Sequence, residues 1–242
     1  MTNRRFPLLD RRNYMGKLKP SSSRRRRLSF EQLECRRLLA TVQWDGGGNG
    51  TAWSDPLNWV GDSLPTAADD AIINVPLSNP VITVTGNNTV KSLVTSEVIT
   101  FNVGTFTTPS IQLNAIGSIA GATIVGANFS GSGTLQVTSA SGTLNGVTLG
   151  VNTTLREGAS GSGNQVTALN GLTLAGGSVL RLERPTNYNG DTVDVGLNFA
   201  GGDSVLGGTG VVELFSNYNP ASFGGQAAGE NDVRVRSTAG KI

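Results

Sequence analysis

Acidic and arginine side chains gather in the C-terminal third of the chain, in a combination that could cleave a polysaccharide. They are Glu183, Asp191, Asp194 and Asp203, with Arg181 and Arg184. Such cleavage needs paired carboxylates, or an aspartate with arginine or lysine and calcium, gathered on neighbouring strands. Whether these side chains meet depends on the elements that carry them.

Several catalytic sites are excluded by composition. The chain has no histidine, which removes the Ser-His-Asp, Cys-His and His-zinc arrangements. Cys35 is the single cysteine, so no intramolecular disulfide can form. The fold must therefore rest on packing and hydrogen bonds.

All three tryptophans, Trp44, Trp53 and Trp59, lie close together in the sequence and are followed by an apolar strand at 71–75. Tryptophan buries a large area at low entropic cost. We therefore expect residues 41–75 to form a cap that covers the open end of a stacked domain. The alternative is an aromatic platform for sugar rings.

A calcium loop is a second alternative for this segment. Asp45, Asn49 and Asp55 could supply oxygen ligands, and calcium is the one cofactor that the sequence raises. Their spacing fits neither an EF-hand loop nor a Gly-Gly-x-Gly-x-Asp repeat. We favour the cap and assign no cofactor.

The elements that must position these residues are short strands rich in Val, Ile, Thr and Leu, separated by Gly and Asn. Four rows of similar sequence recur at equal intervals: Ile119–Ile124, Leu144–Leu149, Leu169–Leu174 and Asp194–Phe199. They align one glycine column (Gly121, Gly146, Gly171, Gly196) and two apolar columns (Ala122, Val147, Leu172, Leu197 and Ile124, Leu149, Leu174, Phe199) around a polar column. A further apolar column follows at Leu155, Leu180 and Val205.

A fixed period with one residue type per column is typical of a solenoid, in which each coil covers the apolar face of the next. The sequence predicts an all-β, single-stranded, right-handed parallel β-helix of about 25 residues per coil. The β-solenoid is expected over 76–242, with its clearest repeat at 119–205. The glycine column predicts turns that need a positive φ.

This register does not bring the candidate acids together, since none of the four has another acid one period away. Asp194 falls in the column of Ile119, Leu144 and Leu169, where a coil boundary explains it most simply. Arg156 and Arg181 are predicted register mates that could clamp an anionic sugar, although solvated positions are the more ordinary interpretation.

The polar column of Thr123, Thr148 and Thr173 could form a flat ice-binding face. Outward threonine is, however, common on any strand. We therefore assign no catalytic, cofactor-binding or metal residue.

Residues 1–40 form a basic leader. They hold 12 Lys+Arg and 3 Asp+Glu, a net +9, whereas 41–242 hold 7 and 14, a net −7. The arginine run at 24–27 has no interleaved aromatic residues, so nucleic-acid binding is disfavoured. The sequence contains no run of 18 or more apolar residues, so it predicts no transmembrane segment. We expect the leader to be disordered or partly helical.

The leader's end resembles a known export motif. Within 28–40, the pattern Phe30-Glu31-x-Leu33-Glu34-x-Arg36-x-Leu38-Leu39-Ala40 resembles the short N-terminal motif of planctomycete extracellular proteins. A lipoprotein site at Cys35 is spoiled by Glu34, and a twin-arginine signal at Arg24-Arg25 lacks the apolar stretch that should follow. The resemblance implies export and no particular chemistry.

The tryptophan segment resembles the opening found before β-helical regions of large secreted, autotransporter-like bacterial proteins, through Trp44-Asp45, a glycine-rich run and Asn58-Trp59. Together these resemblances imply an exported cell-surface or extracellular β-helix protein. Because the sequence carries no recognisable catalytic site, we expect this protein to be structural or adhesive and not catalytic. Its expected partners are cell-surface polysaccharide or other surface proteins. The alternatives are a carbohydrate-active β-helix enzyme of the polysaccharide lyase or glycosidase type, and a glycan- or calcium-binding module.

Overall fold

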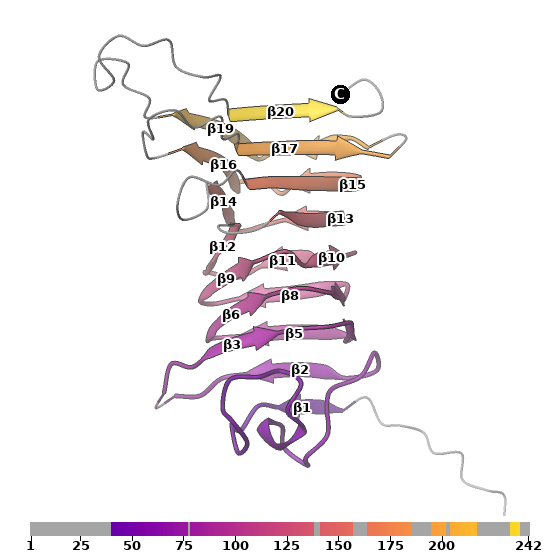
Figure 1. Ribbon diagram of the computed structural model, residues 1–242, viewed down its shortest axis with the longest axis vertical. Helices are drawn as coiled ribbons and strands as arrows, with labels where there is room; N and C mark the ends of the chain where they lie inside the picture. Colours follow the sequence, from indigo (N-terminus) through magenta and orange to yellow (C-terminus); the bar gives the residue numbers. More distant parts are fainter. Residues whose placement is uncertain are drawn as a thin grey trace, which may run out of the picture. The chain divides into compact units, whose positions relative to one another are not determined.

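The computed structural model describes residues 40–76, 78–137, 141–156, 164–184, 195–201, 204–216 and 233–237. These residues form strands almost throughout, with one 3-10 turn, η1 (Pro56–Asn58). Every pairing between named strands is parallel, and the strands form stacked coils (Figure 1). No helix in the described ranges has the length and apolarity needed to cross a membrane.

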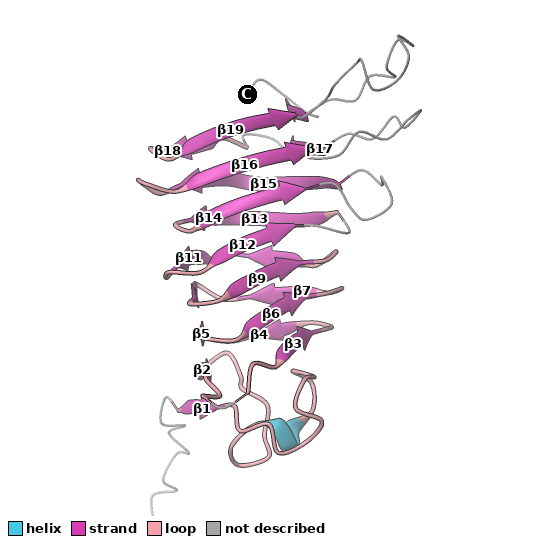
Figure 2. Ribbon diagram, turned by 90° about the vertical axis from the view of Figure 1, so that its left-hand side faces the viewer, coloured by secondary structure: helices cyan, strands magenta, loops and turns pink. Residues whose placement is uncertain are grey.

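Each complete coil contributes strands to three faces (Figure 2). The first face comprises β4 (Asn88–Thr89), β7 (Thr105–Thr107), β10 (Thr123–Val125), the first halves of β13 (Gly142–Leu149) and β15 (Asn164–Leu174), β17 (Val195–Ala200) and β20 (Val233–Ser237). The second face comprises β1 (Thr41–Gln43), β2 (Asp70–Ile73), β5 (Ser92–Thr95), β8 (Ser110–Leu113), β11 (Asn128–Ser130), the second halves of β13 and β15, and β18 (Leu206–Gly208). The third face comprises β3 (Val81–Val84), β6 (Val98–Phe101), β9 (Ile116–Ile119), β12 (Thr134–Val137), β14 (Asn152–Arg156), β16 (Val179–Arg184) and β19 (Val211–Ser216).

Alternation along each strand builds the core. Inward residues of the first face stack as one apolar ladder of Phe106, Ile124, Leu144, Ala168 and Phe199, all buried. Their sequence neighbours point outward and are mostly polar. Because parallel coils place equivalent residues in register, each apolar side chain covers the one below it. The predicted all-β parallel β-helix is confirmed.

Two long strands bend from the first face to the second. β13 bends at Gly146, with φ +61°, and β15 bends at Asn170 and Gly171, with φ +53° and +89°. The Asn170 side-chain amide donates to Asn145 Oδ1 at 2.7 Å, one coil away. Positive φ is easiest for glycine and is tolerated by asparagine, so the predicted turns at Gly121, Gly146 and Gly171 are confirmed.

The predicted period holds for only one step. Val147, Thr148 and Leu149 pair with Leu172, Thr173 and Leu174, as predicted. Before this step the coils are shorter: Leu93 pairs with Ile111, Ile111 with Phe129, and Phe129 with Leu149. After it the coil is longer, since Leu174 pairs with Gly208.

The outer rows of the predicted alignment are therefore wrong. Ile124 pairs with Leu144 and not with Leu149, while Leu172 pairs with Leu206 and not with Leu197. The four sequence rows could be aligned at equal intervals because turns at different corners of the coil share a glycine followed by alternating apolar and polar residues. Gly121 lies at the corner before the first face, Gly146 at the corner after it, and Gly196 inside strand β17 without a positive φ.

The column of Leu155, Leu180 and Val205 is also wrong. Leu155 pairs with Leu182, and Leu180 pairs with Thr153. Val205 is 62% exposed instead of buried. The cause is the variable length of the connection that precedes each strand.

The coils lengthen mainly at one corner, between the third face and the first. The successive connections there run over 120–122, 138–141, 157–163, 185–194 and 217–232, each longer than the one before. Since the strands before these connections pair in register, all five connections leave the same edge of the third face. The leader, 1–40, lies outside the described residues except for Ala40, and right-handed winding stays a prediction.

Candidate functional site

The tryptophan segment packs into the core. Trp44, Trp53 and Trp59 are only 4%, 1% and 0% exposed. Trp59 meets Trp44 and Trp53 edge to face, with ring centroids 5.0 and 4.7 Å apart, and Trp53 meets Phe106 at 5.4 Å. Edge-to-face pairs are a favourable aromatic geometry. Because the rings are buried, they present no platform to a sugar.

Asn49 and Asp55, two of the residues weighed as calcium ligands in the alternative interpretation, serve as hydrogen-bond acceptors that shape the glycine-rich loop. Asn49 Oδ1 accepts from the Thr51 and Ala52 amides and from the Asn58 side chain, at 2.8 to 3.0 Å. Asp55 Oδ2 accepts from the Asn49 amide at 3.0 Å. These bonds explain why the oxygens face the loop backbone.

Asn58 holds the centre of this loop and is fully buried. Its Oδ1 accepts from the Gly48 and Gly50 amides at 3.0 and 2.8 Å, and its Nδ2 donates to the Ala52 carbonyl at 2.9 Å. Sequence reasoning missed this role. An asparagine directly before a core tryptophan, beside a glycine-rich run, was the available signal.

Two of the predicted acid and arginine residues meet on the third face. Arg181 Nε lies 3.6 Å from Glu183 Oε2, and Arg181 Nη1 lies 3.4 Å from Glu213 Oε2 on the next coil. The Arg181 guanidinium also lies 4.2 Å from the centre of the Phe215 ring. The two carboxylates therefore flank one arginine on neighbouring strands, and its single positive charge balances one of their two negative charges.

The other predicted residues lie apart from this cluster or outside the described residues. Arg156 pairs with Glu183 in the ladder, so the prediction that it is the register mate of Arg181 is wrong; Thr154 holds that position. Arg184 is buried at the end of β16, beside the connection 185–194. Asp191, Asp194 and Asp203 fall outside the described residues.

A buried asparagine, Asn164, fastens the corner where the connections lengthen. Its Nδ2 donates to the carbonyls of Val137, at 2.5 Å, and of Arg156, at 2.8 Å. One amide thus joins the ends of β12 and β14 to the start of β15. Such bonding satisfies strand-end carbonyls that would otherwise be buried without partners.

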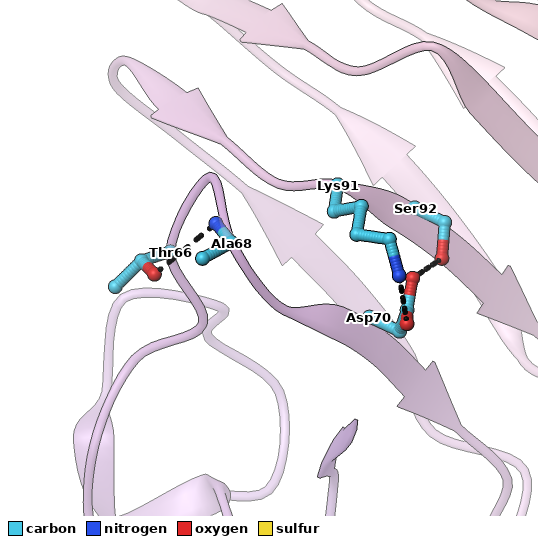
Figure 3. A network of polar contacts seen from close by, with 5 residues as sticks. All are labelled: Thr66, Ala68, Asp70, Lys91 and Ser92. Carbon is cyan, nitrogen blue, oxygen red and sulfur yellow. Dashed lines mark hydrogen bonds and ion pairs between the residues drawn. The ribbon is translucent and has the colours of Figure 1, made fainter. Parts of the chain in front are cut away.

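A network of polar side chains lies near the N-terminal end of the second face (Figure 3). Lys91 Nζ donates to Asp70 Oδ2 at 2.7 Å, and Ser92 Oγ donates to Asp70 Oδ1 at 2.5 Å. The Lys91 hydrogen bond, with help from Ser92, lowers the pKa of Asp70. Nearby, the Ala68 amide donates to Thr66 Oγ1 at 3.4 Å. The network joins neighbouring coils, and Asp70 acts as an ionised acceptor.

An open pocket of about 270 Å³ lies near this network. Its lining is mostly apolar and consists of Ala40, Val42, Val60, Ser63, Leu64, Thr66 and Asp69. Asp69 Oδ2 accepts from the Thr66 amide and hydroxyl at 2.8 and 2.6 Å, which closes the adjacent turn. The Asp69 carboxylate therefore stabilises a turn at the rim of the pocket.

No family model, curated protein or solved structure matches this chain. The fold by itself defines the class: an all-β parallel β-helix with a tryptophan-rich N-terminal segment. Within the described residues, no group of three or more His, Cys, Asp or Glu side chains is placed to hold a metal ion. The comparisons therefore leave function to be argued from the geometry.

Proposed function

We propose that this chain is an exported cell-surface or extracellular β-helix protein with a structural or adhesive role and without catalytic activity. The observation that most supports the absence of catalytic activity is that the glutamates of the charged cluster on the third face are already paired with an arginine. Glu183 and Glu213 both lie beside Arg181, which also covers Phe215. A general base must be within hydrogen-bond reach of a substrate proton, whereas both of these carboxylates lie against the Arg181 guanidinium.

The shape of the coil stack supports the same role. The described strands present long outer faces on which the strands of successive coils lie in parallel register, an architecture suited to extended contact with another surface. The predicted planctomycete-like export motif at 28–40 supports an extracellular location. We expect the surface partners to be polysaccharide or other surface proteins.

A carbohydrate-active enzyme is the second candidate, favoured by one observation. Glu183 and Glu213 lie on adjacent strands with Arg181 between them, which is the kind of set that cleavage of an acidic polysaccharide requires. If a substrate carboxylate displaced either glutamate from Arg181, that glutamate would become available as a base. This candidate predicts released product, which the first does not.

The test offers acidic polysaccharides to the full chain, with and without calcium, and measures retention of the protein and release of unsaturated or reducing ends. The proposal expects no release. Release that disappears in Glu183→Gln or Asp194→Asn would establish the enzyme instead.

Location is tested separately, in the cells that make the protein. Protease is added to intact cells, and loss of the protein is compared with loss of a cytoplasmic marker. The proposal expects digestion of the protein alone. Equal protection of both proteins would contradict export.

A further inference from the structure

The C-terminal end of the coil stack leaves three strands with an open edge (Figure 1). Among the described residues, β18 pairs only with β15, β19 only with β16, and β20 only with β17. These are the last strands of the second, third and first faces. Their outer backbone N–H and C=O groups are therefore placed to pair with a further strand on every face.

Inward side chains of this last coil are left exposed. Leu214 continues the ladder of Leu155 and Leu182, yet it is 58% exposed, whereas the other two are fully buried. The other inward apolar residues of the last coil are only partly buried: Leu206, Val212, Val233 and Val235. The apolar interior of the stack is therefore presented at this end, and such a surface favours contact with another apolar surface.

The N-terminal end differs, because the tryptophan segment covers the edges of two faces there. On β3, the Thr83 amide donates to the Thr51 carbonyl at 2.8 Å, and the Trp53 amide donates to the Thr83 carbonyl at 3.0 Å. On β1, the Gln43 carbonyl accepts from the Val60 amide at 2.8 Å. Within the part of the chain that the structure describes, these edges are thus already bonded, which disfavours head-to-tail stacking of two copies.

Charged side chains decide how two C-terminal ends would meet. A two-fold axis across the end brings the strands of two copies together antiparallel. An axis through the first face pairs β20 with itself and opposes the outward Arg234 and Arg236 to the same arginines. An axis through the third face pairs β19 with itself and opposes Glu213 to Glu213. Like charges opposite each other are destabilising, so both arrangements are disfavoured.

The third axis, through the second face, pairs β18 with itself and β19 with β20 of the other copy. This arrangement sets Glu213 of each copy against Arg234 and Arg236 of the other, so the charges are complementary. The inward residues of β19 and β20 then also meet, because directly opposed residues of antiparallel strands point to the same side.

We propose that two copies of this chain associate through their C-terminal ends, with β19 of each copy antiparallel to β20 of the other. This inference goes beyond the proposed function and does not rest on it. The contact pairs the open edges and covers Leu214 in both copies. Because both copies use the same surface, the assembly closes at two.

Sedimentation velocity of the purified full chain measures the assembly over a range of protein concentrations. Reducing buffer keeps Cys35 from linking two copies. We expect a dimer at the higher concentrations and no larger species. A monomer at every concentration, its end covered by its own chain or open to a different protein, would overturn the proposal. Assemblies that lengthen with concentration would overturn it too, because they require head-to-tail contact.

Charge reversal locates the contact. Glu213→Arg sets a cation against Arg234 and Arg236 of the other copy and should weaken the dimer at least about tenfold. Glu183→Arg is the matched control, because Glu183 also lies beside Arg181 but one coil before the end, and the dimer should be unchanged. Adding Arg234→Glu and Arg236→Glu to Glu213→Arg should restore the dimer. Failure of this rescue, or equal weakening by the control, would overturn the assignment.

The apolar end is tested separately. Leu214→Asp places a charge where the two ends meet, so the dimer should be lost. The far-ultraviolet circular dichroism spectrum should stay that of the parent, because Leu214 is exposed in a single copy. Val81→Asp changes a similarly exposed residue (51%) near the opposite end of the third face and should leave the dimer intact. A dimer that survives Leu214→Asp, or that is lost equally in both variants, would overturn the proposal.

Discussion

Leu149 and Leu174 are direct partners in the parallel ladder between β13 and β15, although a whole coil separates them in the sequence. Both side chains are buried, and they continue the apolar ladder that runs through Leu93, Ile111 and Phe129. The same ladder that stabilises the core positions the outward residues beside it. The packing of the core and the placement of the outward side chains therefore depend on one register.

Leu174→Asp should lower the free energy of unfolding by about 3 kcal/mol or more, because it buries an unpaired charge in this ladder. Urea denaturation followed by circular dichroism measures the change. Thr173→Asp is the matched control, since its side chain is exposed and its effect should be small. Similar losses in both variants would contradict the inward position of Leu174.

Trp59→Ala should cost about 3 to 5 kcal/mol, the usual range for removing a buried aromatic residue. The ring is fully buried between two other tryptophans, and its Nε1 donates to the Trp53 carbonyl at 2.9 Å. Leu57→Ala, close by in the sequence and exposed, should change stability little. A stable Trp59→Ala protein would show that the tryptophan segment does not close the core.

Substitution by alanine should lower the free energy of unfolding by different amounts at two glycines, Gly146 and Gly131. At Gly146, with φ +61° and no atom near the added Cβ, alanine should cost about 1 to 2 kcal/mol for the left-handed backbone alone. At Gly131, with φ +107°, the Cβ would also collide with the Leu113 carbonyl, so the loss should be larger. Thermal unfolding of the two variants gives the comparison, and a larger loss at Gly146 would contradict it.

Acid should weaken the contact between the first two coils that the Asp70–Lys91 ion pair makes. The pKa of Asp70 is lowered in the fold, so its ion pair with Lys91 stabilises the protein above the ordinary aspartate value of 3.8. This contribution is lost as pH falls below 3.8 through the folded value. Since both side chains are partly exposed, the effect should be at most about 1 kcal/mol.

Asp70→Asn provides the measurement, as the change in unfolding free energy between neutral pH and pH values below the ordinary aspartate pKa. The parent should lose more stability than the variant over this range. A variant with the same acid sensitivity as the parent would show that Asp70 contributes nothing to it.

The fold class could be predicted because alternation and glycine spacing are local properties of the sequence. The columns of Val147 with Leu172 and of Leu149 with Leu174 were correct for this reason. The remaining register could not be predicted, because each connection between the third and first faces has its own length. The residue with which a strand residue pairs depends on the number of residues in the coil between them. The pattern of residues within the strand carries no information about that number.

The charged cluster was predicted only in part. Arg181 and Glu183 lie on one strand, on the same side of it, and both were named as candidates from the sequence, but their meeting was not predicted. Glu213 joins them because β16 pairs with β19, which places Glu213 against Arg181 although it lies a whole coil later in the sequence. The pairing of Thr123 with Thr143 was missed for the same reason, since they become neighbours through a step shorter than the predicted period.

The most direct test of the whole account is the register itself, measured by disulfide formation between paired cysteines in a Cys35→Ser background. The outward pairs Thr148→Cys with Thr173→Cys and Thr123→Cys with Thr143→Cys are ladder partners, so mild oxidation should consume both thiols of each pair. Thr123→Cys with Thr148→Cys, one predicted period apart but on different faces, should keep its thiols free. Cross-linking of this last pair in place of Thr123→Cys with Thr143→Cys would contradict the stacking on which every conclusion above depends.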